Sequence, residues 1–444
     1  MANIKDMTEG KPLRLMIGFA VPLLLANALQ MFYTIADSAI VGRILGVSAL
    51  ASIGATASPY WLVYGAVLST TQGFGVVFAQ RFGAKDMDGL RRAFVTAVCL
   101  AAAFSAVFGC IGALGSRFML RMLNTPPVLL DGAVTYLSWL LGGIFIAFAY
   151  SLMGSMLRAL GDSKTPMRGM MFSSMLNIAL DLALIIPFGV KGAAAAALLA
   201  QSAACVYCFL VLRKSGVLNG CVFKWDTDSA AAMLRLGLPL GFRSVIIEAG
   251  GLVVQLHVNN YGMEFVAGIA VAKRMYGLLL IAASALEATN ATYTAQNYGA
   301  GNYKRVKQGI FTGGLLTLAA AAAIMAFTLP LGRFILGLLI EGEPGQITAV
   351  LDIGVRQLTA LTLGLPVLHL LFLYRSALEG IGKPLFPTLS GFMELGFRVS
   401  SVLLLTPIMG EWGIFLSDPA GWVAAAGLLV VSYYFGERKA RLII

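Results

Sequence analysis

Two carboxylates lie in apolar stretches of the N-terminal half, each with a polar residue four positions earlier. Asp37 follows Tyr33, and Asp181 follows Asn177 in the run MLNIALDLALIIP. Residues four apart share a helix face, so each pair would present its polar groups together. Carboxylate and amide oxygens can hold a small cation, and two carboxylates brought together can instead share a proton. The structural alternative is that Asp37 caps a helix and Asp181 hydrogen-bonds a neighbouring helix.

The composition places these residues in membrane-spanning helices. The chain has 444 residues, of which 59% are hydrophobic and 12% are charged, and its mean hydropathy is +0.84. Soluble proteins carry about 25% charged residues and about 45 to 50% apolar ones. The sequence therefore predicts an all-α polytopic membrane protein. It excludes a soluble enzyme and a nucleic-acid-binding module, despite a net charge of +11. Acidic residues inside membrane spans are expensive and mark functional sites by default.

Twelve transmembrane helices are expected, because a bilayer is crossed by about 20 apolar residues. The expected spans are residues 13–37, 48–72, 91–115, 128–150, 166–187, 191–212, 234–260, 265–289, 307–331, 349–373, 385–408 and 412–435. Lys and Arg residues concentrate in alternate connections between these spans. The positive-inside rule therefore predicts that both termini are cytoplasmic.

The chain contains an internal repeat. Pro22 matches Pro239, and the octet AQRFGAKD at 79–86 matches AQNYGAGN at 295–302. Four later landmarks match at a single offset of 221 residues: Gly161, Pro166, Gly189 and Gly192 with Gly382, Pro387, Gly410 and Gly413. The repeat predicts two six-helix lobes, residues 1–213 and 231–444, joined by a cytoplasmic linker at 214–230. Because each lobe would hold an even number of spans, the lobes should be related by a pseudo-twofold axis along the membrane normal, as in many transporters.

The second half carries a different set of charges. Glu394 and Arg398 are spaced i,i+4 and are expected to form a structural ion pair. Glu248 has no such local partner, which leaves it available for a proton or a cationic substrate. Elsewhere, Met175 belongs to a methionine-rich segment that could adapt to varied apolar shapes. Pro22 would bend the first helix near Asp37.

The motifs together resemble those of the multidrug and toxic-compound extrusion (MATE) family. The resemblance rests on PLLLANALQMFYTIADSAIVGRILG (22–46), the two octets above, GDSKTP (161–166) and GVKGAAAAALLAQ (189–201), and it covers essentially the whole chain in order. It implies twelve helices in two lobes, alternating access, and export of organic cations or polyaromatic compounds in exchange for protons or sodium ions.

The resemblance also implies roles for single residues. Asp37 fits the family's first-helix aspartate, Asn177 and Asp181 fit the Asn-xxx-Asp pair of the fifth helix, and Pro22 fits the bending proline. These matches favour the DinF-like branch, with a proton or a sodium ion held by Asp37, Asn177 and Asp181. Ala197 stands where a sixth-helix threonine is common, which weakens the sodium interpretation relative to the proton one.

The leading hypothesis is a secondary active antiporter of a bacterial cytoplasmic membrane, without a cofactor, that acts as a monomer on small amphipathic or cationic substrates. The alternative within the same superfamily is a flippase for lipids or lipid-linked oligosaccharides, which would need a basic cavity. Arg243, Arg356, Arg375 and Arg398 make such a cavity conceivable. An intramembrane enzyme is disfavoured because the sequence lacks HExxH and GxSxG motifs and a clustered Asp/His set.

Overall fold

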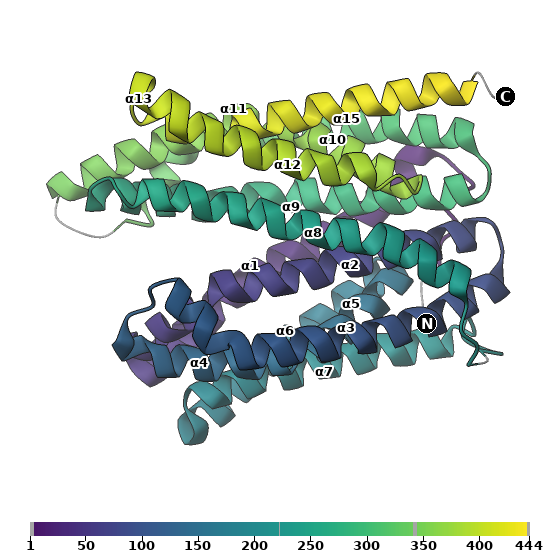
Figure 1. The fold of residues 1–444 in the computed structure, drawn as a ribbon, viewed down its shortest axis with the longest axis horizontal. Helices are drawn as coiled ribbons and strands as arrows, with labels where there is room; N and C mark the ends of the chain where they lie inside the picture. The colour runs from purple at the N-terminus through teal and green to yellow at the C-terminus, as the bar shows by residue number, and fades with distance from the viewer. Residues whose placement is uncertain (1–3, 222, 341–343, 442–444) are drawn as a thin grey trace. The chain divides into compact units, whose positions relative to one another are not determined.

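The chain folds into helices joined by short turns (Figure 1). The computed structural model describes residues 4–221, 223–340 and 344–441. The N-terminal helices are α1 (Pro12–Ala55), α2 (Ala57–Gly83), α3 (Met87–Met122), α4 (Pro127–Gly142), α5 (Ile144–Ala159), α6 (Lys164–Phe188) and α7 (Val190–Lys214). The C-terminal helices are α8 (Thr227–Val258), α9 (Met263–Gly299), α10 (Tyr303–Gly337), α11 (Pro344–Gly380), α12 (Leu385–Ser400), a π-helical turn η1 (Ser401–Leu405), α13 (Thr406–Met409), α14 (Trp412–Phe415) and α15 (Ser417–Arg441).

The predicted polytopic architecture agrees with this helix set. Within the described ranges, eleven candidate spans are long and apolar enough to cross a membrane. The bent pair α4 and α5 would make a twelfth span if it crosses as one. Residues 128–150, expected as one straight span, thus lie in two helices that meet at an angle of 46°. The break falls at Gly142 and Gly143, where glycine weakens the helix.

Two other expected spans also differ in detail. Helix α1 runs past the expected end at residue 37 to a break at Gly46 (φ +81°, ψ 178°), and a second helical segment then reaches Ala55. The span expected at 385–408 contains the π-helical turn η1. Such turns are rare and frequently lie at functional sites.

Matched positions of the sequence repeat take matched backbone conformations. Gly161 and Gly382 both have φ +79°. Gly189 and Gly410 have φ +57° and +59° and ψ −135° and −133°. These positive φ values suit glycine, which lacks the Cβ that makes them costly for other residues. The repeat is therefore present in the local structure as well as in the sequence.

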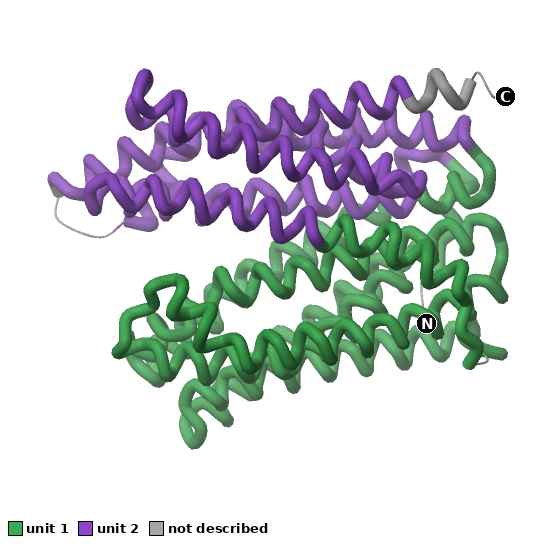
Figure 2. The backbone as a smooth tube through the Cα atoms, viewed as in Figure 1, with its two compact units in different colours: residues 1–10, 17–241, 295–302 green, residues 11–16, 242–294, 303–444 purple. Residues whose placement is uncertain are grey.

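The described chain divides into two compact units (Figure 2). Unit 1 comprises Met1–Gly10, Ile17–Gly241 and Ala295–Asn302, and unit 2 comprises Lys11–Met16, Phe242–Thr294 and Tyr303–Ile444. The sequence placed the boundary in the linker at 214–230, whereas unit 1 includes the start of α8. The reason is a close helix crossing: a Cβ at Gly73 of α2 would overlap the backbone of Gly237 in α8.

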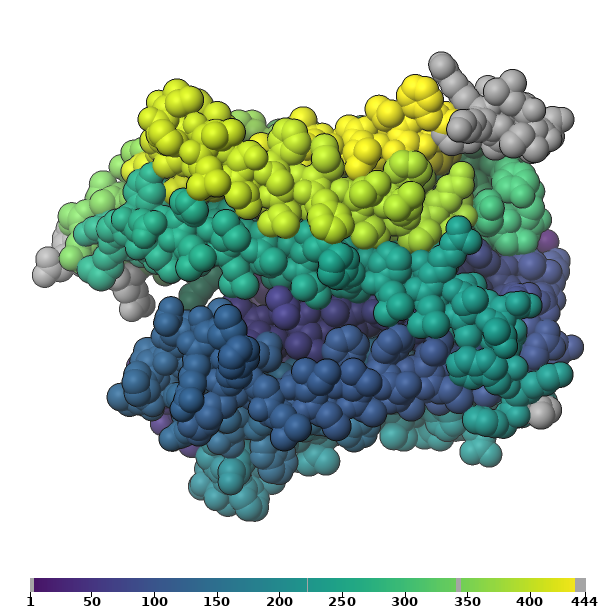
Figure 3. Space-filling view, viewed as in Figure 1, coloured from purple at the N-terminus to yellow at the C-terminus, as the bar shows by residue number. Residues whose placement is uncertain are grey.

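Each unit has its own apolar core. In unit 1, Phe74, Phe78 and Phe148 are fully buried in one cluster with residues of α3 and α4. In unit 2, Phe265 stacks on Phe415 with ring centroids 5.8 Å apart. Apolar side chains also cover the outside, as lipid-facing helices require. Helix α12 shows its side chains along its length in the space-filling view (Figure 3), and Leu385, Phe392 and Phe397 are among the exposed ones.

Candidate functional site

Helices α1 and α6 place the two acidic residues of unit 1 beside one another. Val41 and Ile185, each four residues beyond an aspartate, are fully buried in one small cluster. This contact fixes the face that each helix turns toward the other. Because residues four apart share a face, Asp37 and Asp181 face each other one turn away from the apolar contact.

Tyr33 and Asn177 join the same two helices by a hydrogen bond. The Tyr33 hydroxyl donates to the Asn177 side-chain carbonyl over 2.5 Å. Asn177 is 2% exposed, and its Nδ2 group has no partner among the described residues. The bond therefore sets which end of the amide faces Tyr33 and leaves the buried amide nitrogen unpaired.

The carboxyl groups of Asp37 and Asp181 lie within hydrogen-bonding reach of each other. Asp181 is fully buried, and no N–H or O–H group of the described residues reaches either of its oxygens. Within the described ranges, neither Asp37 nor Asp181 forms an ion pair with an arginine, lysine or histidine. Two carboxylates only accept, so they can hydrogen-bond each other only when one carries a proton.

This arrangement can bind a proton or a small cation. A shared proton would satisfy both carboxyl groups and remove the like-charge repulsion between them. A sodium ion could use the carboxylate oxygens and the Asn177 carbonyl, which accepts one hydrogen bond from Tyr33 and keeps a second lone pair. Within the described parts of the chain, no group of three or more His, Cys, Asp or Glu residues has the arrangement of a metal site.

Tyr136 of α4 is a residue near this site that sequence reasoning missed. It packs against the cluster that contains Val41 and Ile185. It also lies close enough to Asp37 and Asp181 to interact with both electrostatically. A tyrosine in an apolar span carries no spacing signal that would pair it with residues on α1 and α6. Its proximity follows only from the packing of α4.

Pro22 and Met175 lie on the same two helices as the site. Pro22 is buried inside α1, which stays helical through it, and a functional bend there stays a prediction. Met175 of α6 is 73% exposed, next to the exposed Phe172 and Met171. This apolar face is open to ligands or lipids.

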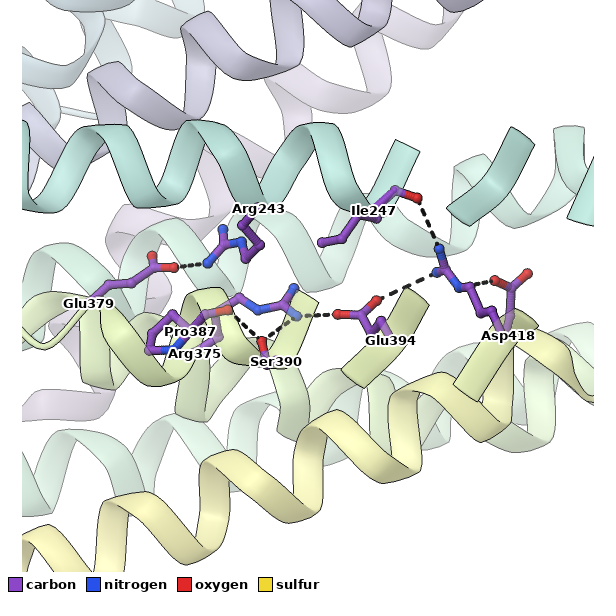
Figure 4. Close-up of polar contacts among 9 residues, drawn as sticks. Arg243, Ile247, Arg375, Glu379, Pro387, Ser390, Glu394 and Asp418 are labelled. Atoms are coloured by element: carbon purple, nitrogen blue, oxygen red, sulfur yellow. Dashed lines mark hydrogen bonds and ion pairs between the residues drawn. The ribbon is translucent and has the colours of Figure 1, made fainter. Parts of the chain in front are cut away.

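Unit 2 contains a chain of buried ion pairs (Figure 4). Arg243 of α8 pairs with Glu379 of α11, and Arg375 of α11 pairs with Glu394 of α12. Glu394 also contacts its predicted partner Arg398, with Glu394 Oε2 3.5 Å from Arg398 Nη2. Glu394 thus connects two arginines.

Arg398 has two further contacts. Its Nε lies 2.8 Å from an Asp418 oxygen, and its Nη1 donates to the Ile247 carbonyl over 3.3 Å. The guanidinium therefore ties α12 to both α8 and α15. The spacing i,i+4 predicted Glu394 as one partner, but partners from other helices leave no such signal in the sequence.

Glu248 and Glu287 are not members of these ion pairs. Glu248 of α8 is exposed, and Arg398 is the nearest charge acting on it. Glu287 of α9 is half-buried beside the Arg243 and Glu379 pair. Both glutamates belong to unit 2, whereas Asp37, Asn177 and Asp181 belong to unit 1. A role for Glu248 in binding a proton or a cationic substrate stays a prediction.

Comparisons with known proteins match both copies of the repeat and most of the chain. The MatE family model matches residues 22–183 and 239–402, one match in each copy of the repeat. Probable multidrug resistance protein YpnP of Bacillus subtilis (strain 168) is 32% identical over 306 residues, which cover 68% of each chain. Probable multidrug resistance protein YoeA of the same organism is 26% identical over 441 residues, covering 94% of this chain and 92% of the relative.

Solved structures share the fold. A crystal structure of MATE in the bent conformation superposes with a TM-score of 0.87 at 20% identity, covering 98% of this chain and 96% of the other. An outward-facing multidrug resistance MATE family transporter of the MOP superfamily gives a TM-score of 0.86 at 20% identity, with 98% of both chains covered. These likenesses confirm the predicted all-helical fold of two six-helix lobes.

Proposed function

The chain belongs to the MatE family, and on that basis we propose that it is a secondary active antiporter that exports organic cations or polyaromatic compounds in exchange for protons or sodium ions. Relatives named as probable multidrug resistance proteins support the substrate class. The family fold supports transport by alternating access.

One observation supports the antiport proposal most strongly. Asp37 and Asp181 lie within hydrogen-bonding reach of each other, and no donor reaches either Asp181 oxygen among the described residues. A purely structural carboxylate pair would be expected to have basic or N–H partners, because unpaired buried charges are costly. A pair that gains and loses a proton or a cation explains why this site lacks them.

The cycle follows from differential binding. A ligand shifts a two-state equilibrium only by the difference in its affinity for the two states. A cation held between α1 and α6 would bring the two helices together, and its loss would leave two repelling carboxylates. The cation would thereby favour the state that releases substrate outside.

The pairing of the unit 2 arginines argues against the flippase alternative. An anionic head group needs basic groups that are not already neutralised. Arg243 pairs with Glu379, Arg375 with Glu394, and Arg398 with Asp418. Arg356 pairs with Glu411, with Nη1 3.2 Å from Oε2. The basic cavity that this alternative requires is therefore not supported by these four residues.

We propose further that the protein is a multi-pass protein of the bacterial cytoplasmic membrane with both termini inside. The positive-inside pattern supports this orientation.

Dye efflux from proteoliposomes tests the proposed function. Purified protein would be reconstituted with ethidium, and efflux would be followed under an imposed pH gradient or an imposed sodium gradient. Efflux that follows one of the gradients is the expected result and identifies the coupling ion. Absence of gradient-driven movement for a panel of organic cations would overturn the proposal.

A further inference from the structure

The chain segment before α1 is bound to the C-terminal end of α5. The Lys5 N–H donates to the Leu160 carbonyl over 3.0 Å. Gly161 has φ +79° and lies so close to Lys5 that a Cβ on it would overlap the Lys5 carbonyl. Met7 is fully buried. Residues 5–8 are therefore a specifically docked strap.

The same strap binds the second copy of the repeated octet, at the end of α9. The Met7 N–H donates to Gln296 Oε1 over 2.8 Å, and Asn297 Nδ2 donates to the Met7 carbonyl over 3.1 Å. Gln296 Nε2 also donates to the Ala159 carbonyl over 2.7 Å. One glutamine side chain thus connects the strap and the end of α5 to the second repeat.

The two octets also pack against each other in a reciprocal way. A Cβ on Gly83 would overlap the backbone of Gln296, and a Cβ on Gly299 would overlap the backbone of Gln80. Gly83 and Gly299 are equivalent positions of the repeat, and so are Gln80 and Gln296. Each glycine therefore lets the equivalent helix end of the other copy approach to backbone contact.

These contacts explain why residues 295–302 belong to unit 1 while the rest of α9 and all of α10 belong to unit 2. Both octets run into basic helix starts, with Arg91 and Arg92 after the first and Lys304 and Arg305 after the second. Basic connections lie on the cytoplasmic side. The strap and the octets are thus expected at the cytoplasmic end of the protein.

We propose that residues 5–8 and the two octets, 79–86 and 295–302, form a latch that closes the cytoplasmic end and opens once in every transport cycle. The inference rests on the alternating-access function proposed above. Alternating access moves one repeat against the other around a central site. Contacts between the two copies at one membrane side must therefore break when that side opens. Gln296 is the central residue, because its side chain bonds both the strap and α5.

The first test measures latch opening without transport. The five native cysteines would be replaced by serine, Met7→Cys would be introduced, and its labelling rate with a maleimide would be measured in detergent. Gln296→Ala should increase this rate about tenfold, because it removes two buried hydrogen bonds. The matched control Gln308→Ala changes an exposed glutamine on α10 and should leave the rate unchanged. An unchanged rate in folded Gln296→Ala protein would overturn the latch.

Asn297→Ala is a second variant for the same test, should Gln296→Ala not fold. It removes the bond to the Met7 carbonyl and should accelerate labelling by a smaller factor. Equal labelling of this variant and the parent protein would contradict the proposal.

The second test links the latch to transport. Met7→Cys with Asn297→Cys would be joined by a bis-methanethiosulfonate reagent that dithiothreitol cleaves. Dye efflux should be lost on crosslinking and return on cleavage. The control pair, Lys5→Cys with Leu160→Cys, joins the strap to α5 within one repeat and should retain efflux when crosslinked. Full efflux from completely crosslinked Met7 and Asn297 positions would overturn the proposal.

The two tests separate the latch from the proposed function. If the parent protein moves no dye under any gradient, the antiport proposal fails. The labelling rates of Met7→Cys still decide whether the latch exists and whether Gln296 holds it closed.

Discussion

The Tyr33 hydroxyl donates a 2.5 Å hydrogen bond to the Asn177 carbonyl, joining α1 to α6 across 144 positions of sequence. The bond holds the amide next to Asp181, the residue one turn further along α6. We therefore propose that Tyr33 is a positioning residue, which would act on the carboxylates through Asn177.

Replacing either aspartate should uncouple export from the ion gradient. Asp37→Asn and Asp181→Asn each remove one of the two neighbouring carboxylates that are proposed to bind the coupling cation. Gradient-driven ethidium efflux should fall to the level of empty liposomes, while the elution volume and helical content stay those of the parent protein. Asp131→Asn, which changes an exposed acid paired with Arg117, is the matched control and should keep full efflux. Undiminished efflux by both site variants would contradict the assignment.

Tyr33→Phe should weaken coupling without abolishing it. The variant keeps the ring and loses the bond to Asn177, which is worth about 1 kcal/mol, or a several-fold change in affinity. The coupling-ion concentration at half-maximal efflux should rise several-fold with little change in maximal rate. A change in maximal rate alone would argue against a positioning role.

Gly73 should tolerate no side chain. A Cβ there would overlap the Gly237 backbone at the crossing of α2 and α8. Overpacking of this kind costs about 1 to 3 kcal/mol, so Gly73→Ala should lower the unfolding temperature in detergent. Gly54→Ala is the control, because a Cβ on Gly54 would point into open space. Equal unfolding temperatures for the two variants would refute the close crossing.

The buried pair of Arg243 and Glu379 should be costly to break. Glu379→Gln leaves the buried guanidinium without its carboxylate, and the loss of one partner of such a pair costs about 3 to 5 kcal/mol. Asp352→Asn removes the partner of Arg333 in an exposed pair, where the cost is below about 1 kcal/mol. Denaturant unfolding in micelles would compare the two variants. Similar losses of unfolding free energy in the two variants would show that the buried Arg243 is not stabilised by Glu379.

Asp226 should stabilise the start of α8 in a pH-dependent way. Burial raises the pKa of Asp226, but hydrogen bonds from Ser229 and Asp228 outweigh it and hold the pKa below its ordinary value. A lowered folded-state pKa gives stability that is present above the ordinary Asp pKa of about 3.9 and is lost as pH falls through the folded value. Asp226→Ala should therefore lower the unfolding temperature at neutral pH by the loss of a cap worth about 1 kcal/mol. The difference from the parent should vanish once the pH falls below the folded-state pKa of Asp226, and a difference that persists in strong acid would contradict this role of Asp226.

Local spacing predicted which polar residues share a helix face. The four-residue steps from Tyr33 to Asp37 and from Asn177 to Asp181 put each pair on one face, because helix periodicity is a property of the chain itself. The repeated glycines indicated an internal repeat, and the two copies have matched φ values at Gly161 and Gly382.

Contacts between helices could not be predicted in the same way. Tyr136 approaches the aspartates only through the packing of α4, and Arg398 finds Asp418 on α15 in addition to its i,i+4 neighbour. The repeated octet was visible in the sequence, but its reciprocal glycine contacts and the docking of Met7 were not. Such contacts depend on how helices that are distant in the sequence pack against each other. The periodicity of a single sequence does not show which helices pack together.

Cation release on substrate binding tests the proposed coupling site most directly. Parent protein and the double variant Asp37→Asn/Asp181→Asn would be titrated with ethidium in weakly buffered detergent solution, with proton and sodium release followed by electrodes. The parent should release about one cation per bound dye, because the carboxylate pair shares one. The double variant should release none. Equal cation release from both proteins would contradict a coupling site at Asp37 and Asp181.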